Sequence, residues 1–310
     1  MSPAESPPSS GVTVGERTVG AALAHARDTL QGAGSPSARL DAEVLVAWSM
    51  ERERSWLLAH LDDQLPAEAA TVLSSLVTRR AMGEPVAYIR GFKEWYGLRI
   101  ATDDRALIPR PETELLVDAA VADIAERMVS DDEPIEVREV GTGSGAVSVA
   151  LARRFRAALT LGRLRLVASD VSADALELAA DNLAAHGLAH LVTLAVADLL
   201  DPVASLPQAD VVVANLPYVR SAEVATGHGS LAWEPALALD GGADGLDLVR
   251  RLLSRFPDRL AGHGSALLEI GADQAEPVVA EVAGLPGTWS AVTTRDLAGH
   301  ERIIRLARDR

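Results

Sequence analysis

The chain carries a short polar motif, Asn215-Leu216-Pro217-Tyr218, directly after an apolar run that is typical of a buried parallel strand. Open parallel sheets bind ligands at the carboxyl ends of their strands. A planar amide or aryl amine has a delocalised nitrogen lone pair, so acceptors on its N–H groups must turn that lone pair toward an electrophile. The Asn215 side-chain oxygen and the Leu216 carbonyl could be those acceptors, while Pro217 stiffens the loop and Tyr218 packs against a planar group. The alternative is an ordinary Asn-Pro turn.

A second motif joins an earlier apolar run to a helical pattern, and it consists of Gly141, Thr142, Gly143, Ser144 and Gly145. Glycines allow a tight turn and a close approach of the backbone to a ligand, and a helix N-terminus supplies N–H donors. Dinucleotides, nucleotide phosphates and S-adenosylmethionine all bind to turns of this kind. The glycine motif alone therefore leaves the ligand open.

Acidic residues at three successive strand ends narrow the choice of ligand. Glu139 could meet a cationic ammonium group, and Asp170 could accept hydrogen bonds from two ribose hydroxyls. Asp198 and Leu199 could bound an adenine with one acceptor and one apolar face. Singly, the three acids could be a solvated charge, a helix cap and a turn residue. Together they favour S-adenosylmethionine over a dinucleotide, because a carboxylate at position 139 would repel a pyrophosphate. A site of this kind needs no metal.

The rest of the sequence predicts the elements that position these residues. Residues 1–16 are rich in Ser and Pro and predict a disordered tail, and residues 17–83 have the periodicity of a small helical bundle. Residues 84–110 alternate and are aromatic, as in a β-hairpin connector. Residues 111–310 begin with a helix from about Glu112 and then alternate strands with helices, which predicts an α/β domain with a doubly wound parallel sheet and a terminal antiparallel pair.

Composition excludes several classes of protein. There are no cysteines, which excludes disulfides and thiolate metal sites, and no apolar run approaches the roughly 18 residues of a membrane span. The N-terminus lacks the pattern of a signal peptide, so we expect a cytoplasmic protein. With 29 basic and 44 acidic residues the net charge is −15, which argues against a stable nucleic-acid partner.

Taken together, these segments resemble the release-factor glutamine methyltransferases (the PrmC/HemK family). The similarity covers nearly the whole chain after the tail and includes ARLDAEVLVA, GEPVAYIRGFKEWYGLRI, LIPRPETELLVD, VGTGSGAVSVALA, WEPALALDGGADGLD, LLEIGADQAEPV and DLAGHERII. The resemblance implies a class I methyltransferase fold, Rossmann-like with a mostly parallel seven-stranded sheet and an N-terminal helical domain that helps to recognise the substrate. It also implies methyl transfer from S-adenosylmethionine to the glutamine amide in the Gly-Gly-Gln loop of bacterial peptide-chain release factors.

The resemblance also assigns roles to residues. It places the 141–145 glycine loop against the cofactor, Asp170 on the ribose and Leu199 beside the adenine, and it gives residues 215–218 the substrate glutamine. Arg110 and Glu112 fall in a loop that lies near the active site in the family, although a capped helix start is the structural alternative there.

The chain departs from the family pattern at two points. The family has Asn-Pro-Pro-Tyr where this chain has Leu216, and it usually has Asp in place of Glu139. Asn-Leu-Pro-Tyr is typical of ribosomal RNA adenine dimethyltransferases, so adenine N6 methylation of RNA or DNA is an alternative function. Two others are a family paralogue that methylates another protein's glutamine and a cofactor-binding scaffold without catalysis.

Overall fold

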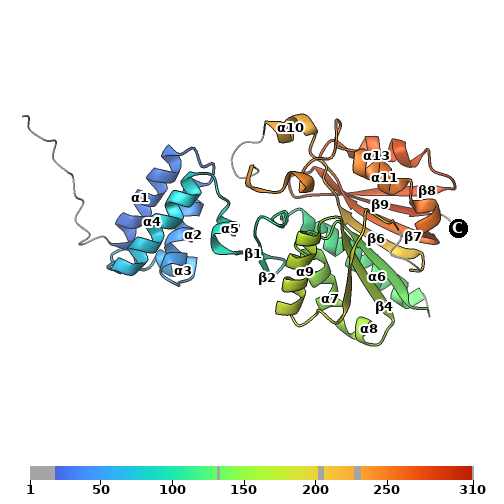
Figure 1. Ribbon diagram of the computed structural model, residues 1–310, viewed down its shortest axis with the longest axis horizontal. Helices are drawn as coiled ribbons and strands as arrows, with labels where there is room; N and C mark the ends of the chain where they lie inside the picture. The colour runs from blue at the N-terminus through green and yellow to red at the C-terminus, as the bar shows by residue number, and fades with distance from the viewer. Residues whose placement is uncertain (1–17, 131–132, 202–205, 227–231, 309–310) are drawn as a thin grey trace, which may run out of the picture. The chain divides into compact units, whose positions relative to one another are not determined.

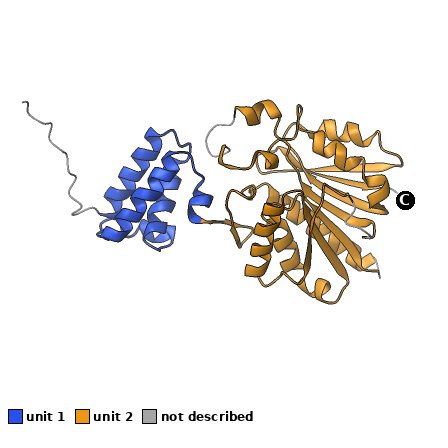
Figure 2. Cartoon of the chain, viewed as in Figure 1, with its two compact units in different colours: residues 1–90 blue, residues 91–310 orange. Residues whose placement is uncertain are grey.

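The computed structural model describes residues 18–130, 133–201, 206–226 and 232–308. The chain divides into two compact units, residues 1–90 and residues 91–310, which Figure 2 distinguishes by colour. The tail that we predict for residues 1–16 lies outside the described residues.

The first unit is helical, as predicted. Its helices are α1 (Val19–Gly32), α2 (Ala38–Ser49), α3 (Arg54–Leu57), α4 (Ala67–Ala81) and α5 (Val86–Arg90). Leu30, Leu45 and Leu57 are buried in its core. An ion pair between Arg80 and Asp41, at 2.8 Å, joins α4 to α2. Because α5 contacts both α2 and α4, the helical unit extends past residue 83, into the stretch where the sequence predicts the connector.

A β-hairpin opens the second unit, formed by β1 (Phe92–Trp95) and β2 (Leu98–Ala101) in antiparallel pairing. Side-chain hydrogen bonds attach it to the rest of the unit, among them those of Asn182 and Trp95. The amide of Asn182 accepts a hydrogen bond from the Ala101 N–H at 2.7 Å and donates one to its carbonyl at 3.1 Å. The Trp95 indole donates to the Arg110 carbonyl at 2.7 Å. The hairpin is therefore fixed beside the segment that leads into the first helix of this unit, at Thr113.

A seven-stranded sheet forms the centre of the second unit, with the order β5-β4-β3-β6-β7-β9-β8 (Figure 1). Its strands are β3 (Ile135–Val140), β4 (Leu164–Asp170), β5 (Val192–Val196), β6 (Ala209–Asn215), β7 (Leu260–Glu269), β8 (Trp289–Arg295) and β9 (Glu301–Arg308). The first five strands in this order are parallel, and β9 is antiparallel to both β7 and β8. The predicted parallel sheet and terminal antiparallel pair are confirmed, and β5 is shorter than its apolar run indicates.

Helices cover both faces of this sheet (Figure 1). They are α6 (Thr113–Ser130), α7 (Ala146–Arg154), α8 (Arg156–Thr160), α9 (Ala173–Ala185), α11 (Asp247–Leu253), α12 (Phe256–Arg259) and α13 (Ala275–Val282). A further short helix, α10 (Ser221–Ala225), buries none of its residues. Strand β6 shows why its sequence is continuously apolar. Val211 and Val213 pack into the core beneath α6 and α7, whereas Val212 and Ala214 pack into the core beneath α11 and α13.

The strand order reverses between β3 and β6, the two central strands. Ligands of open α/β sheets bind in the crevice beyond the strand ends at such a switch point. Val140, Asp170, Asn215 and Glu269 stand at the carboxyl ends of the four strands around it. None of the described helices combines the length and the apolar character that crossing a membrane requires.

Candidate active site

The glycine loop after β3 has a backbone conformation that other residues rarely adopt. Gly141, Gly143 and Gly145 have φ values of +72°, +52° and +76°. A Cβ atom at Gly145 would lie 2.8 Å from that of Ala179 on α9. The glycines therefore let α7 begin in contact with α9, and Gly141 and Gly143 line the crevice.

Asp170 connects this loop to the next helix. Its Oδ2 accepts a hydrogen bond from the Gly143 N–H, and its Oδ1 accepts one from the Ser172 N–H, each at 2.9 Å. The side-chain cap of α9 is Ser172, whose hydroxyl accepts from the Ala175 N–H at 3.2 Å. Asp170 is thus not the helix cap, and its carboxylate lines the crevice.

Glu139 is 3% exposed, so it is not a solvated strand-end charge. Burial raises the pKa of its carboxyl to about 7, against the opposing effect of a hydrogen bond from the Ser148 hydroxyl. The nearby Thr142 hydroxyl also lowers this pKa, but it is buried and forms no hydrogen bond of regular geometry among the described residues. A buried hydroxyl without a partner is costly, which points to a ligand that completes this part of the site.

Two adjoining cavities occupy the crevice. The larger has a volume of about 250 Å³ and the smaller about 60 Å³, and both are lined by Leu107, Gly141, Gly143 and Asn215. The larger is also lined by Asp170, Asp198, Leu199, Leu216 and Pro217, and the smaller by Arg110, Thr113, Glu139, Thr142 and Ser144. Most residues that the sequence predicts for the site are therefore brought together. Gly145, Glu112 and Tyr218 line neither cavity.

Asp198 and Leu199 lie just beyond the end of β5. The sequence predicts neither the ion pair of Asp198 nor the backbone conformation of Leu199. The Asp198 carboxylate forms an ion pair with Arg251 of α11 at 2.5 Å, so it is already engaged on the helix side. Leu199 is 8% exposed and has φ +57°, a strained conformation for a residue with a side chain. Strain of this kind is often found where the backbone must face a ligand.

The Asn215–Tyr218 loop is held from two sides. The Asn215 amide nitrogen donates to the Thr113 hydroxyl at 3.0 Å, which orients the amide and leaves its oxygen as the acceptor. The Leu216 side chain is 6% exposed and its Cδ2 lies 3.3 Å from where a Cβ at Gly141 would be. The Tyr218 hydroxyl donates to Glu269 at 3.3 Å. The side chain that departs from the family pattern therefore packs against the glycine loop and the larger cavity.

A glycine-rich loop, residues 240–245, packs directly on this motif, and we call it the brace. Gly241 donates to the Val219 carbonyl at 2.8 Å. A Cβ at Gly241 would lie 2.6 Å from the Pro217 carbonyl oxygen, and one at Gly245 would lie 2.3 Å from the Tyr218 carbonyl oxygen. Only glycine permits such an approach of two backbones.

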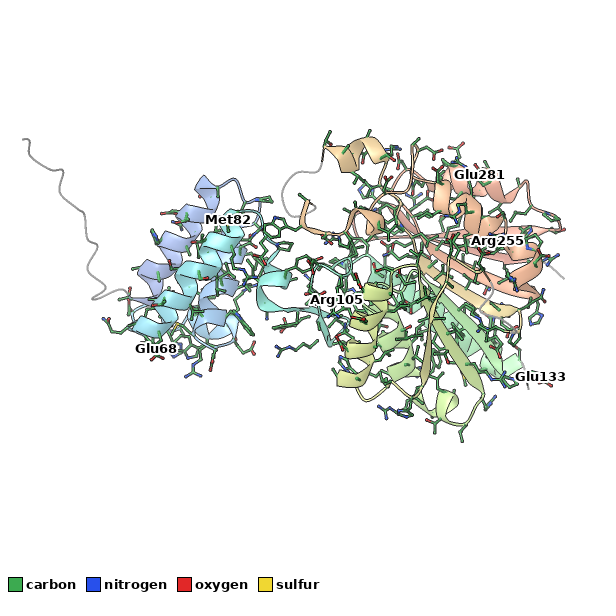
Figure 3. All side chains as sticks on the ribbon, in the orientation of Figure 1. Glu68, Met82, Arg105, Glu133, Arg255 and Glu281 are labelled. Atoms are coloured by element: carbon green, nitrogen blue, oxygen red, sulfur yellow. The ribbon has the colours of Figure 1, made fainter. Side chains whose placement is uncertain are left out.

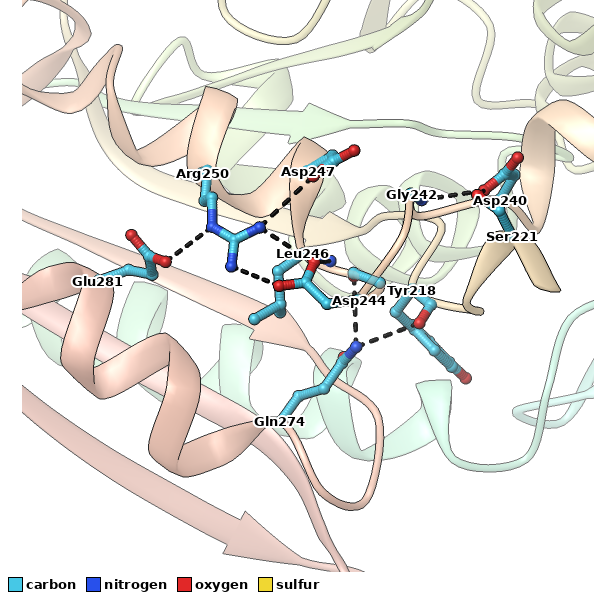
Figure 4. Close-up of polar contacts among 11 residues, drawn as sticks. Tyr218, Ser221, Asp240, Gly242, Asp244, Leu246, Asp247, Arg250, Gln274 and Glu281 are labelled. Atoms are coloured by element: carbon cyan, nitrogen blue, oxygen red, sulfur yellow. Dashed lines mark hydrogen bonds and ion pairs between the residues drawn. The ribbon is translucent and has the colours of Figure 1, made fainter. Parts of the chain in front are cut away.

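Side-chain hydrogen bonds and ion pairs also hold the brace, as Figure 4 shows. The buried Gln274 amide donates to the carbonyls of Tyr218 and Gly245 at 3.1 and 3.3 Å, and its oxygen accepts from the Gly271 N–H at 2.8 Å. On the outer side Arg250 pairs with Asp244 at 2.6 Å. The Asn215–Tyr218 loop is therefore held by hydrogen bonds to its backbone as well as to its side chains.

Arg110 and Glu234 connect the two segments on which the family resemblance depends most. The Glu234 side chain is fully buried, and it accepts hydrogen bonds from Arg110 at 2.6 Å and from the Ile108 N–H at 3.0 Å. Arg110 lines the smaller cavity. The pair thus fixes the loop before α6 against the segment after α10.

Replacing Glu234 by alanine leaves the Ile108 N–H and Arg110 without their acceptor. We expect the free energy of unfolding, measured with urea, to fall by roughly 2–4 kcal/mol. The matched control is Glu223→Ala, which removes the exposed partner of Arg220 and should cost under about 1 kcal/mol. Equal losses in the two variants would contradict a structural role for the buried pair.

Several residues of the site could not be assigned from the sequence. Glu234, Gln274 and Glu269 lie in segments that resemble the family, yet their spacing gives no sign of their partners, which are remote in the chain. Arg105, labelled in Figure 3, lines the larger cavity and pairs with Asp103 at 2.7 Å. Apart from the family resemblance, only the position of Glu269 at the end of an apolar run was a local signal.

Comparison with known proteins agrees with this architecture. A family model described as the PrmC N-terminal domain matches residues 21–91, and one described as a methyltransferase domain matches residues 137–226. The release factor glutamine methyltransferase of Moorella thermoacetica is 37% identical over 93% of this chain and 97% of its own length. That of Rhodopirellula baltica is 35% identical over 90% and 92%.

Among solved structures, the ribosomal protein L11 methylase of Lactobacillus delbrueckii subsp. bulgaricus is 20% identical, covers 68% of this chain and 86% of its own, and has a TM-score of 0.46. The fold is that of a class I methyltransferase with an N-terminal helical unit. By its identity to curated relatives along nine-tenths of its length, the chain belongs to the release factor glutamine methyltransferase family.

Proposed function

We propose that this enzyme transfers a methyl group from S-adenosylmethionine to the side-chain amide nitrogen of the glutamine in the Gly-Gly-Gln loop of a bacterial peptide-chain release factor. One observation carries the proposal. The Asn215–Tyr218 loop stands at the switch point of the sheet, beside a glycine loop and two acids, in a chain of this family.

The residues around the two cavities fit S-adenosylmethionine, which supplies an electrophilic methyl group when it is bound. Asp170 would hold the ribose hydroxyls, because a carboxylate has acceptor capacity beyond its two bonds to N–H groups. Glu139 would face the ammonium group, and Thr142 would give its unpartnered hydroxyl to the ligand. Asp198 would have to divide its carboxylate between Arg251 and the adenine.

The acceptor amide would be held by the Asn215 oxygen and the Leu216 carbonyl. Thr113 fixes the Asn215 amide through its nitrogen, so the oxygen is pre-oriented before the acceptor arrives. The brace and Gln274 keep the following backbone in place. Catalysis in this site consists of orienting the acceptor nitrogen and excluding water for an in-line displacement, with no nucleophile to activate.

The leucine at position 216 is the one feature that favours a different acceptor, adenine in RNA or DNA. Its side chain packs against Gly141 and lines the larger cavity, where the cofactor would bind. The backbone carbonyl, which any residue supplies, is the atom offered to the acceptor. The change from proline therefore bears on cofactor packing more than on the choice between an amide and an adenine.

The experiment is methyl transfer from labelled S-adenosylmethionine to purified, unmethylated release factor, to the same factor with Gln→Ala in its Gly-Gly-Gln loop, and to ribosomal RNA. Label in the factor that disappears with the Gln→Ala change supports the proposal. Label in RNA alone would establish the adenine alternative. Label in neither acceptor would leave a paralogue with another protein substrate or a scaffold without catalysis.

The Leu216→Pro variant tests the role of that position separately. We expect kcat and KM to stay within about tenfold of the parent, because Asn215 ends β6 and already has the extended backbone that a following proline requires. The larger change should be in KM for S-adenosylmethionine, measured by titration at a saturating release factor. A switch of acceptor between RNA and protein on this substitution would show that residue 216 selects the acceptor.

A further inference from the structure

Glu269 is a buried acid that the proposed chemistry leaves without a role. It ends β7, is 2% exposed, and pairs in register with Asn215 at the end of β6. Its Oε2 is buried and has no hydrogen-bond partner among the described residues. A buried carboxyl group with an unpartnered oxygen costs folding free energy. Its presence at this strand end therefore suggests that it has a function.

The neighbours of Glu269 are the two ends of the Asn215–Tyr218 loop, which we call the acceptor loop after its proposed role. The Tyr218 hydroxyl donates to its Oε1 at 3.3 Å. The Thr113 hydroxyl is close enough to lower the pKa of the carboxyl, and this same hydroxyl accepts from the Asn215 amide at 3.0 Å. The Glu269 carboxyl group thus contacts Tyr218 directly and lies beside Thr113, which orients Asn215.

The surrounding charges set when this carboxyl ionises. Burial raises the pKa of Glu269 to about 7, the hydroxyls of Thr113 and Tyr218 oppose that rise, Glu112 adds to it and Arg302 of β9 reduces it. Arg302 is itself paired with Asp296 at 2.9 Å. Burial and the charge of Glu269 raise the pKa of Tyr218 to about 12, so its hydroxyl remains a donor at neutral pH.

We propose that Glu269 is a positioning residue of the acceptor site, whose ionised carboxylate accepts from the hydroxyls of Tyr218 and Thr113 and so holds the acceptor loop in its working conformation. The inference rests on the proposed function. An ionised carboxylate only accepts hydrogen bonds, whereas a protonated one carries its own O–H, which must donate and so competes for the same neighbours. The ionised carboxylate, which holds the loop, is therefore lost as the pH falls, so activity should decrease toward low pH.

The test is the pH dependence of kcat with saturating release factor and S-adenosylmethionine, in the parent and in Glu269→Gln. For the parent we expect kcat to rise with pH through a midpoint near 7 and then level off. Glutamine has the same shape but no such titration, so the variant should lose this rise and fall to about one-tenth of the parent's plateau. Glu276→Gln, an exposed change on α13, is the matched control and should keep the parent profile.

Two further measurements keep the result interpretable. The affinity for S-adenosylmethionine should stay unchanged in Glu269→Gln, which separates misplacement of the acceptor from loss of the fold. In Tyr218→Phe, the further change Glu269→Gln should cost less than it does in the parent, because the two groups act through one contact. The proposal would be overturned if Glu269→Gln kept the parent's kcat and the same midpoint in its pH profile.

The unfolding temperature provides a readout that needs no acceptor. A carboxyl whose pKa is higher in the folded state stabilises the protein below the pKa of the unfolded chain and loses that contribution as the pH rises to about 7. We expect this decline to be shallower in Glu269→Gln. If the parent fails to methylate the release factor at every pH, the proposed function is wrong, while identical declines in parent and variant would count against Glu269 itself.

Discussion

In Asn215→Ala we expect kcat for methyl transfer to fall by about 10²–10³-fold, the effect of removing one positioned polar group from the reacting centre. The substitution removes the acceptor oxygen and also the amide that donates to Thr113 at 3.0 Å. Because Asn215 lines both cavities, binding of S-adenosylmethionine should weaken as well, but by a smaller factor. Single-turnover rates at saturating cofactor, together with calorimetry of cofactor binding, separate the two effects.

Two companion variants divide the contribution of Asn215. Asn215→Asp keeps an acceptor oxygen, whereas Thr113→Val keeps Asn215 and removes the hydroxyl that orients it. We expect about a tenfold loss of kcat in Thr113→Val, since misorientation costs less than deletion. An Asn215→Ala enzyme with more than about a tenth of the parent's rate would place the acceptor nitrogen somewhere other than at this loop.

The second large effect is expected from Gly245→Ala in the brace. A Cβ there would lie 2.3 Å from the Tyr218 carbonyl oxygen and 2.5 Å from the Gln274 amide nitrogen, at a φ of +81°. Neither backbone can yield without moving the acceptor loop. We expect kcat to fall by at least about 10²-fold and the free energy of unfolding by roughly 2–4 kcal/mol, from overpacking and backbone strain together.

Gly162→Ala is the matched control for that variant. Gly162 has φ +70°, but nothing lies within 4 Å of the position where its Cβ would be. It therefore carries the same conformational penalty, of order 1 kcal/mol, without the steric one, and its kcat should equal that of the parent. If urea denaturation and kinetics gave the same result for both alanine variants, the close packing at Gly245 would not matter to the acceptor loop.

Much of the fold could be predicted from the sequence because its signals are local. Apolar runs such as the one at residues 211–213 predict buried strands, and the glycines at 141–145 predict a strand-to-helix turn. The strand ends then place Asp170 and Asn215 at one edge of a parallel sheet without any knowledge of tertiary contacts. These positions follow from the alternation of strands with helices, which predicts a parallel sheet.

The partners of the polar side chains could not be predicted in the same way. Glu234 binds a group that is 124 residues away in the chain, and Asp198 binds one 53 residues away. Nothing in the local pattern around Asp198 indicates that Arg251 engages its carboxylate. The orphaned oxygen of Glu269 likewise depends on three elements that meet only in the folded protein. Such contacts depend on tertiary packing, which a single sequence does not specify.

The brace has a consequence for how this site can diverge. At Gly241 and Gly245 two stretches of main chain touch with no side chain between them, so substitution there cannot reshape the acceptor pocket without breaking it. Elsewhere the larger cavity is lined by side chains without such backbone contacts, for example those of Leu107 and Leu237, which can change one at a time. A lineage that acquires a new acceptor is therefore expected to accumulate its changes among these lining side chains, while Gly241 and Gly245 stay the same.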